Sequence, residues 1–319
     1  MPHLGLGTVG RRVRGDGAVR RRRACARCGR AGERQRRRGP RGGSACRARG
    51  AHGCARRSAG RRRDRLTATL AGILAIDKPE GWTSFDVVAV ARGILGTTRV
   101  GHGGTLDPLA TGLLALLVGE TTRATERLHT APKVYDALVR FGSETATDDR
   151  EGEPTRSAAP PAEASSIEAG LAPLRGAIWQ VPPAYAAVKV GGRPAYARAR
   201  SGETVKLAAR EVQVHRLEMT EWNPPDARLF IVCGSGTYVR SIARDLGRAL
   251  GSAAHLAALR RLAIGALDIA DAVGIEALRS AGHADAVSRL RAMDDETLVL
   301  PRRYLDEAAD KLVGAGGHA

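Results

Sequence analysis

The sequence of 319 residues predicts an α+β protein whose mixed, largely antiparallel sheet is flanked by helices. Three observations predict this class. Short apolar or alternating segments follow one another without the regular helices that separate the strands of a parallel sheet. Residues 83–96 and 238–251 carry apolar side chains at helical spacing and each run ends at a glycine. Residues 113–118 are continuously apolar, which is typical of a strand that is buried on both faces.

The expected elements begin with a short apolar strand at residues 72–77. Thr83 and Asp86 have the spacing of a capping box, which predicts a helix that starts there and ends before Gly96. Residues 134–142 alternate between apolar and polar side chains, so we expect a half-buried strand with Tyr135 on its apolar face. The further expected strands are 185–190, 204–208, 211–219 and 228–233, and the further expected helices are 163–175, 238–250, a short one that carries His255 to Arg261, and 270–290.

The net charge of +18 is distributed very unevenly. Residues 1–65 contain 22 Arg, no Lys and three acidic residues, whereas the rest of the chain has 29 basic and 30 acidic residues. The first segment also has too few large apolar side chains to offset the chain entropy lost on folding. We therefore predict that residues 1–68 are a disordered Arg/Gly-rich extension, whose composition also fits a start codon assigned too far upstream, and that the folded body is close to neutral.

Four of the five cysteines lie in this extension, and only Cys25 and Cys28 have the two-residue spacing of a zinc knuckle. Because the other two do not repeat that spacing, no metal site is predicted. The fifth, Cys233, lies in an apolar run and is expected in the core. No apolar run reaches the roughly 18 residues of a membrane helix, so we expect no membrane association and a cytoplasmic protein.

The segment most indicative of chemistry is residues 101–108, GHGGTLDP. Glycine permits backbone conformations that other residues resist, and Pro108 restricts its own φ angle. Such a loop can hold the carboxylate of Asp107 in one place and let a substrate approach closely. The same residues are also ordinary turn formers, so the loop alone leaves a purely structural interpretation open.

Several other motifs occur with this loop in a fixed order. They are residues 74–84 (LAIDKPEGWTS), 101–108, Gly112, Gly119, 133–135 (KVY), 180–185 (QVPPAY) with Lys189, 236–240 (GTYVR) and 259–262 (LRRL). Together they resemble the motifs of the TruB-type bacterial tRNA pseudouridine synthases, from Gly72 to about Gly265. The resemblance implies a catalytic domain of the pseudouridine-synthase type at residues 69–265.

The resemblance also implies a reaction. The uridine at position 55 in the T-loop of tRNA would be flipped out of its loop, at a cost of a few kcal/mol. Its base would then be detached from the sugar, rotated and rejoined through carbon without a cofactor. Asp107 would be the essential carboxylate. The partners implied are tRNA, through its T-arm stem-loop, and no obligate protein, so a monomer is expected.

Five residues would support Asp107 according to this resemblance. Arg240 would be its cationic partner, because an unpaired buried carboxylate costs several kcal/mol. Tyr135 would stack on the flipped base, Tyr238 and Leu259 would line its pocket, and His102 would meet the RNA. In a formed helix Tyr238 and Arg240 would point about 200° apart, so both can serve one site only if the helix starts at or after them.

Two smaller groups of residues complete the expected site. Lys78 and Pro79 are expected to brace the Asp107 loop. The expected contacts to RNA phosphates are Lys133, Lys189, Arg193, Arg260 and Arg261.

The C-terminal segment, residues 266–319, departs from the family pattern. Many members carry a β-rich RNA-binding domain of the PUA type there, whereas this segment is too short for a complete one. We therefore expect a helical, PUA-like remnant and a weaker grip on tRNA. Two alternatives stay open, namely an RNA-guided pseudouridine synthase of the eukaryotic and archaeal type, and a non-catalytic tRNA-binding or folding protein on the same scaffold.

Overall fold

The computed structural model describes residues 70–305, except 187, 191–192, 195–197, 199–202 and 204–206. The predicted extension at 1–68, with its four cysteines, lies outside the described residues, and so does the end of the chain from 306. Most of the strand that was expected at 204–208 also lies outside them. None of the helices in the described part of the chain is long and apolar enough to cross a membrane.

A mixed, largely antiparallel sheet forms the centre of the described part of the chain, as predicted. Its strands follow the order β14-β1-β3-β12-β4-β11-β10-β7, with β13 beside β12 and β2 beside β3. Only the β1–β14 and β3–β12 pairs are parallel among the described pairs of this sheet. The strands are β1 (Gly72–Lys78), β2 (Val100–His102), β3 (Thr111–Val118), β4 (Lys133–Phe141), β7 (Gly176–Gln180), β10 (Arg210–Asn223), β11 (Asp226–Cys233), β12 (Ala254–Ile264), β13 (Leu267–Asp268) and β14 (Val273–Gly274).

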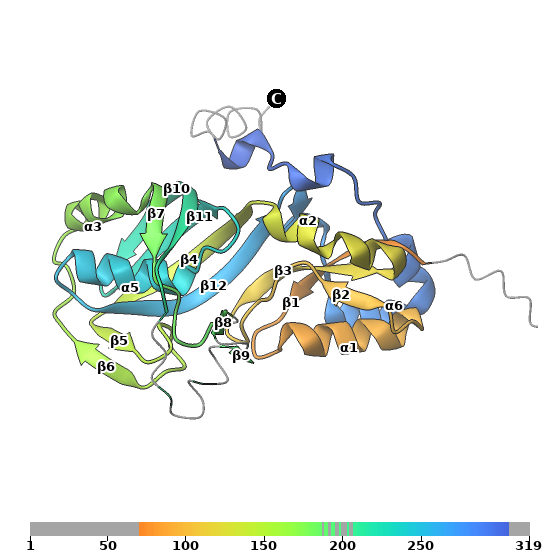
Figure 1. Ribbon diagram of the computed structural model, residues 1–319, viewed down its shortest axis with the longest axis horizontal. Coiled ribbons are helices and arrows are strands. Elements are labelled where there is room, and N and C mark those ends of the chain that lie inside the picture. Colours follow the sequence, from red (N-terminus) through yellow and green to blue (C-terminus); the bar gives the residue numbers. More distant parts are fainter. Residues whose placement is uncertain are drawn as a thin grey trace, which may run out of the picture. The chain divides into compact units, whose positions relative to one another are not determined.

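Helices cover the sheet in two groups (Figure 1). α1 packs against α6 beside β1, while α3 and α5 lie over the strands at the other end, where α5 contacts β12 and α3 contacts β10. The α-helices are α1 (Ser84–Leu95), α2 (Thr125–Thr130), α3 (Ala164–Leu171), α5 (Val239–Ala249) and α6 (Ile275–Ser288). The 3₁₀ helices are η1 (Gly119–Ala124), η2 (Ala172–Leu174), η3 (Ile269–Asp271), η4 (Glu296–Leu298) and η5 (Arg302–Tyr304), and two small ladders pair β5 (Ser143–Thr145) with β6 (Pro154–Ser157) and β8 (Lys189–Val190) with β9 (Arg193–Pro194).

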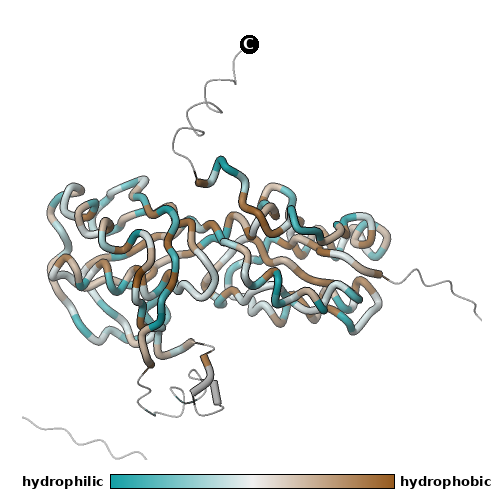
Figure 2. The backbone as a smooth tube through the Cα atoms, turned by 45° about the horizontal axis from the view of Figure 1, so that its top comes forward, coloured by the Kyte–Doolittle hydropathy of each residue, from teal (hydrophilic) through white to brown (hydrophobic). Residues whose placement is uncertain are grey.

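The apolar patterns of the strands explain the two halves of the core. β3 is buried on both faces, because one side packs on α1 and α6 and the other on α2 and the segment near η4, and this accounts for its unbroken apolar run. β4 alternates as predicted: Ala137, Val139 and Phe141 are buried, whereas Asp136 and Arg140 lie on the other face. Figure 2 shows hydrophobic residues concentrated along the central strands.

The first helix is capped as its sequence predicts. The hydroxyl of Thr83 accepts a hydrogen bond from the backbone N–H of Asp86, and the Asp86 carboxylate accepts one from the backbone N–H of Thr83. Gly96 ends the helix in the left-handed conformation, with φ 63°. This helix start lies close to the Asp107 loop, and Ser84 in its first turn contacts that loop directly.

The predicted short helix from His255 to Arg261 is wrong. These residues belong to β12, which pairs with β4 on one side and with β3 on the other. Irregularities at 256–258 and 261–263 interrupt the two-residue alternation of this strand, so its sequence does not show a strand pattern.

Four smaller predictions also need correction. The expected strand at 185–190 is reduced to Lys189–Val190, and the helix expected at 270–290 starts only at Ile275, after η3 and β14. The strand expected at 211–219 extends from 210 to 223, and the helix expected at 163–175 ends at 171, followed by a 3₁₀ turn.

The parallel contact between β3 and β12 brings two site-forming segments together. Gly112 at the start of β3 has φ 94°, and a Cβ atom there would lie 2.3 Å from the carbonyl oxygen of Arg261. Only glycine permits so close an approach at this φ. The strand that carries Leu259 and Arg261 therefore lies directly beside the end of the Asp107 loop.

Candidate active site

The loop from Gly103 to Pro108 is held from three sides. The Ser84 hydroxyl accepts a hydrogen bond from the backbone N–H of Leu106 at 2.9 Å and contacts its carbonyl oxygen at 3.1 Å. The ammonium of Lys78 donates to the carbonyl of Pro108 at 3.3 Å. Two residues after Pro79, the backbone N–H of Gly81 donates to the same carbonyl at 2.8 Å. Lys78 thus contacts the loop that it was expected to brace.

Lys78 is completely buried, and its ammonium also donates to the carbonyls of Pro79 and Trp82. Burial lowers the pKa of Lys78 from 10.5 to about 8, although the nearby Asp107 opposes this shift. With a pKa of about 8, the lysine is still mostly charged at neutral pH.

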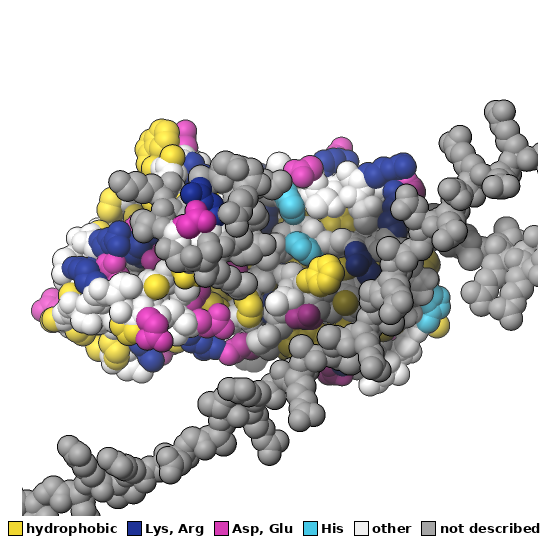
Figure 3. Space-filling model, turned by 60° about the horizontal axis from the view of Figure 1, so that its bottom comes forward, with side chains coloured by type: hydrophobic (Ala, Val, Ile, Leu, Met, Phe, Trp, Pro, Cys, Tyr) yellow, Lys and Arg dark blue, Asp and Glu magenta, His cyan; other side chains and the backbone are white. Residues whose placement is uncertain are grey.

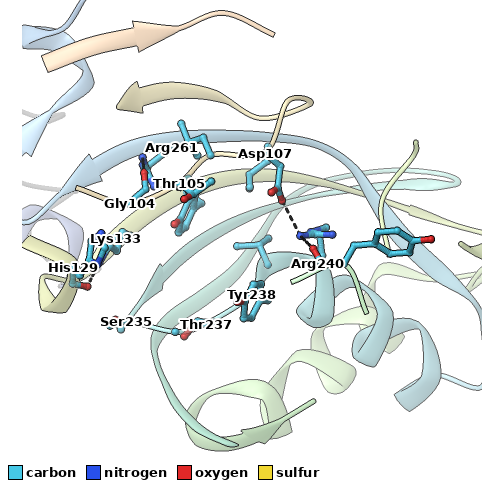
Figure 4. Close-up of a pocket in the computed structure, with 17 residues that line it drawn as sticks. Gly104, Thr105, Asp107, His129, Lys133, Ser235, Thr237, Tyr238, Arg240 and Arg261 are labelled. Atoms are coloured by element: carbon cyan, nitrogen blue, oxygen red, sulfur yellow. Dashed lines mark hydrogen bonds and ion pairs between the residues drawn. The ribbon is translucent and has the colours of Figure 1, made fainter. Parts of the chain in front are cut away.

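Asp107 forms an ion pair with Arg240. The Arg240 Nη2 atom lies 3.0 Å from Oδ2 of Asp107, and the side chains are 7% and 40% exposed, respectively. Figure 4 shows the two groups facing each other across the pocket, Asp107 from the loop and Arg240 from the start of α5. The guanidinium fixes the position of the carboxylate at the edge of the pocket.

Arg240 is fixed by a second set of contacts on its far side. Its Nη1 atom donates to the carbonyl of Thr147 at 3.0 Å and lies 3.5 Å from Oδ2 of Asp149. Its Nη2 atom also donates to the carbonyl of Tyr185 at 3.3 Å. The guanidinium therefore links three segments that are distant in sequence and can move very little.

A second buried ion pair supports this arrangement one turn further along α5. Arg244 Nη1 lies 2.7 Å from Oδ2 of Asp148, and Arg244 Nη2 donates to the carbonyl of Val181. Burial raises the pKa of Asp148, while Arg244 acts in the opposite direction. Two arginines of one helix face, Arg240 and Arg244, thus anchor the two adjacent acids Asp148 and Asp149.

The helix that carries Arg240 begins between the two residues expected to share the site. α5 starts at Val239, and Tyr238 precedes it in an extended conformation with φ −104° and ψ 114°. Gln180 holds this conformation, because its side-chain oxygen accepts from the N–H of Tyr238 at 2.8 Å and its nitrogen donates to the Tyr238 carbonyl at 3.2 Å. As a result Tyr238 and Arg240 both line one pocket, although a continuous helix would separate them.

This pocket has a volume of about 330 Å³. Asp107, Arg240, Tyr135, Tyr238 and Leu259 all line it. Burial raises the pKa of Tyr135, so its phenol stays protonated at neutral pH. The volume of the pocket lies at the lower end of the range for small-molecule sites. The aromatic and apolar walls of the pocket can enclose a planar base beside a carboxylate.

Lys133 and Arg261, two of the residues predicted to contact RNA phosphates, are buried in this structure. Lys133 is 8% exposed, and its ammonium donates to the carbonyls of His129 and Ala131. Arg261 is 1% exposed and donates to Leu113 at 2.7 Å and to Gly104 at 3.0 Å.

Both side chains line the pocket. Burial, together with the charge of Arg261, lowers the pKa of Lys133 from 10.5 to about 8. Basic residues in strands of mixed pattern are expected at the surface. Nothing in the local sequence indicates that the side chains of Lys133 and Arg261 are buried and donate to backbone carbonyls.

The other predicted RNA-contacting residues have different surroundings. Arg260 is 41% exposed and paired with Asp77 at 2.8 Å. His102 ends β2, half-buried, and does not belong to the pocket lining; burial lowers its pKa. Lys189 and Arg193 lie in β8 and β9, and their side chains are outside the described part of the structure.

Three pocket residues or supports were not predicted. Asp149 contacts Arg240 from a segment that reads as a polar loop, and His129 and Tyr185 line the pocket. Tyr185 lies within the QVPPAY motif, which signals it, whereas Asp149 and His129 occur in segments without any distinguishing pattern.

On the face shown in Figure 3, the visible basic side chains lie among acidic and hydrophobic ones, which agrees with a nearly neutral body.

Comparison with protein families agrees with this geometry. The N-terminal domain of the TruB family pseudouridylate synthases matches residues 92–239, and the tRNA pseudouridylate synthase B C-terminal domain matches residues 240–305. The first match contains Asp107, and the second begins at Arg240.

Among curated proteins, the chain is 48% identical over 216 residues to the tRNA pseudouridine synthase B of Thermobifida fusca (strain YX), covering 65% of this chain and 74% of that protein. It is 46% identical over 218 residues to the tRNA pseudouridine synthase B of Xanthomonas campestris pv. campestris (strain B100), covering 68% and 71%.

Two solved structures share the fold. One is a Cbf5-Nop10-Gar1 complex, with a TM-score of 0.51 and 27% identity over 65% of this chain and 53% of that chain. The other is an archaeal box H/ACA sRNP Nop10-Cbf5 complex, with a TM-score of 0.54 and 25% identity over 73% and 63%. The chain thus spans less than two thirds of either structure's matched chain.

Proposed function

Because this chain belongs to the TruB family of pseudouridylate synthases, we propose that it converts uridine to pseudouridine at position 55 in the T-loop of tRNA. We also propose that it recognises the T-arm stem-loop, acts as a monomer without a guide RNA or an obligate protein partner, and works in the cytoplasm. The names of its curated relatives support the tRNA substrate, and the site geometry supports the reaction.

The observation that carries the proposal is the 3.0 Å ion pair between Asp107 and Arg240 at a pocket lined by Tyr135, Tyr238 and Leu259. A scaffold retained only for RNA binding has no need of a half-exposed carboxylate held against a buried guanidinium. The ion pair therefore favours an enzyme over a non-catalytic binder.

The reaction is an isomerisation in which the atoms balance. The bond between N1 of the base and C1′ of the ribose breaks, and a bond between C5 and C1′ forms. C5 loses its hydrogen as a proton and N1 gains one. Asp107 supplies the carboxylate for this exchange, and Arg240 holds that carboxylate in its orientation.

The aromatic residues have a separate task. Stacking of a base on an aromatic side chain contributes about 1–3 kcal/mol, which is comparable to the cost of flipping a nucleotide. Tyr135 and Tyr238 offer such surfaces, and Leu259 adds an apolar wall to the pocket. They hold the freed uracil close to the ribose while it rotates.

The test uses a T-arm stem-loop RNA labelled with tritium at C5 of its uridines. We expect the purified full chain alone to release tritium, because C5 loses its hydrogen in the product. Asp107→Asn should reduce the rate by at least about a thousandfold, since a neutral amide cannot act as the nucleophile.

Asp136→Asn is the matched control. Asp136 is also paired with an arginine, Arg228, at 2.6 Å, but it lies on the solvent face of β4. Its rate should stay within about twofold of wild type. Undiminished release by Asp107→Asn would refute the assigned role, and release that requires an added guide RNA would favour the RNA-guided alternative.

A further inference from the structure

Arg210, the first residue of β10, has a guanidinium edge without a partner. Its Nε and Nη2 atoms are both buried, and neither makes a hydrogen bond with any part of the chain that the structure describes. These two nitrogens form one side of the planar guanidinium, where two parallel N–H groups can hold two oxygen atoms of one anion.

Four other arginines in this chain show what this edge normally binds. In each, Nε and Nη2 donate to the two oxygens of one carboxylate, at distances from 2.6 to 3.0 Å. They are Arg140 with Asp226, Arg216 with Glu218, Arg228 with Asp136, and Arg248 with Glu144. The corresponding edge of Arg210 is buried and lacks such an anion.

Arg210 lies beside the candidate active site. The Cζ atom of its guanidinium is 5.0 Å from the ring centroid of Tyr238, whose side chain lines the Asp107 pocket. In the sheet Arg210 pairs with Gln180, the residue that holds the backbone of Tyr238 on both sides. The unpaired edge is therefore one side chain away from the position proposed for the target base.

Two buried N–H groups without an acceptor are costly, because they have lost their hydration without gaining a hydrogen bond. The adjacent acid, Glu211, points to the other face of β10 and does not compensate them. The anion that an RNA substrate brings to such a position is a backbone phosphate, which presents two oxygens at the spacing that a guanidinium fork matches.

We propose that Arg210 binds, through Nε and Nη2, one backbone phosphate of the RNA next to the flipped uridine. This inference rests on the proposed function. Because both nitrogens are buried in this structure, the phosphate must displace the atoms that cover them. The Arg210 guanidinium above the Tyr238 ring then has two roles. It binds the RNA backbone, and it fixes the ring that faces the base.

The test compares wild type and Arg210→Lys on a set of fluorescent T-arm stem-loops. Each RNA carries one uncharged methylphosphonate linkage, placed in turn at every position around the target uridine, and Kd is measured by fluorescence anisotropy. Lysine keeps the charge but lacks the fork. Arg140→Lys is the control, because Arg140 uses the same edge to bind Asp226 on the exposed face of the sheet.

We expect one linkage to weaken wild-type binding by about ten- to a hundredfold, the range for hydrogen bonds to charged groups. Arg210→Lys should bind the unmodified RNA more weakly by a similar factor and should lose its sensitivity at that linkage alone. Arg140→Lys should reproduce the wild-type profile.

Two results would overturn the proposal. One is a wild-type profile in which no methylphosphonate linkage near the target uridine changes Kd. This result is obtained with wild type alone and so does not depend on whether Arg210→Lys folds. The other is an identical profile for wild type and a folded Arg210→Lys. Tritium release by wild type is measured on the same RNAs, so that failure of the proposed enzyme activity is seen separately from failure of the phosphate contact.

Discussion

Replacing Arg240 by methionine separates two tasks that one guanidinium performs. The variant keeps most of the side-chain volume and removes the charge that faces Asp107 at 3.0 Å and Asp149 at 3.5 Å. Asp149 has only 5% of its side chain exposed, so its carboxylate is left without a counter-charge. Asp107 is 40% exposed and is compensated in part by water.

The expected cost follows from these surroundings. Breaking a fully buried pair by removing one partner costs about 3–5 kcal/mol. Asp149 retains hydrogen bonds from the Thr147 hydroxyl and from the backbone N–H of Glu151, and its contact with Arg240 is long. We therefore expect a loss of about 2–3 kcal/mol in the free energy of unfolding, mostly from Asp149. For a domain of this size that loss lowers Tm by roughly 5–10 °C.

Two assays distinguish the tasks. Thermal unfolding followed by circular dichroism measures the stability, and single-turnover tritium release measures the chemistry. Adding Asp149→Asn to Arg240→Met should recover most of the lost Tm, because the uncompensated buried charge is gone. It should not recover activity, because Asp107 still lacks its partner. A Tm of Arg240→Met within about 1 °C of wild type, or recovery of activity in the double variant, would refute this reasoning.

Two further predictions concern the framework of the site. Gly112→Ala should lower the free energy of unfolding by more than about 3 kcal/mol in chemical denaturation, because its Cβ atom would lie 2.3 Å from the Arg261 carbonyl oxygen at a residue with φ 94°. Gly93→Ala is the control and should be neutral or stabilising, because Gly93 lies in a helix with open space around it. Equal effects of the two substitutions would contradict the packing argument. The pKa values of Lys78 and Lys133 fall to about 8, below the unfolded value of 10.5, so the unfolded state binds more protons above pH 8 and stability should rise with pH. The free energy of unfolding measured with urea should rise by about 1–2 kcal/mol between pH 8 and 9, and Lys78→Met should roughly halve this rise. At higher pH the buried thiol of Cys233 and the phenol of Tyr135 oppose the rise, because burial raises the pKa of both. A flat profile in wild type would contradict the buried lysine charges.

The local sequence predicted most elements of the fold, because their patterns are complete within a few residues. The capping box at Thr83, the alternation of β4 and the unbroken apolar run of β3 each have one physical interpretation. β12 was assigned incorrectly because two irregularities in its pairing interrupt the alternation, and only the strands on either side of it define its conformation.

The sequence by itself determined the family, the loop that carries Asp107 and the choice of Arg240 as a candidate partner, since these depend on short motifs whose order is read directly from the chain. Only the tertiary structure decided that Arg240 also contacts Asp149 and that Arg261 lies beneath the loop with carbonyl partners. It likewise decided that Gln180 keeps Tyr238 out of the helix. These contacts join residues more than 50 positions apart, and whether a charged side chain meets a carboxylate, a carbonyl or water depends on which distant strand the fold brings beside it.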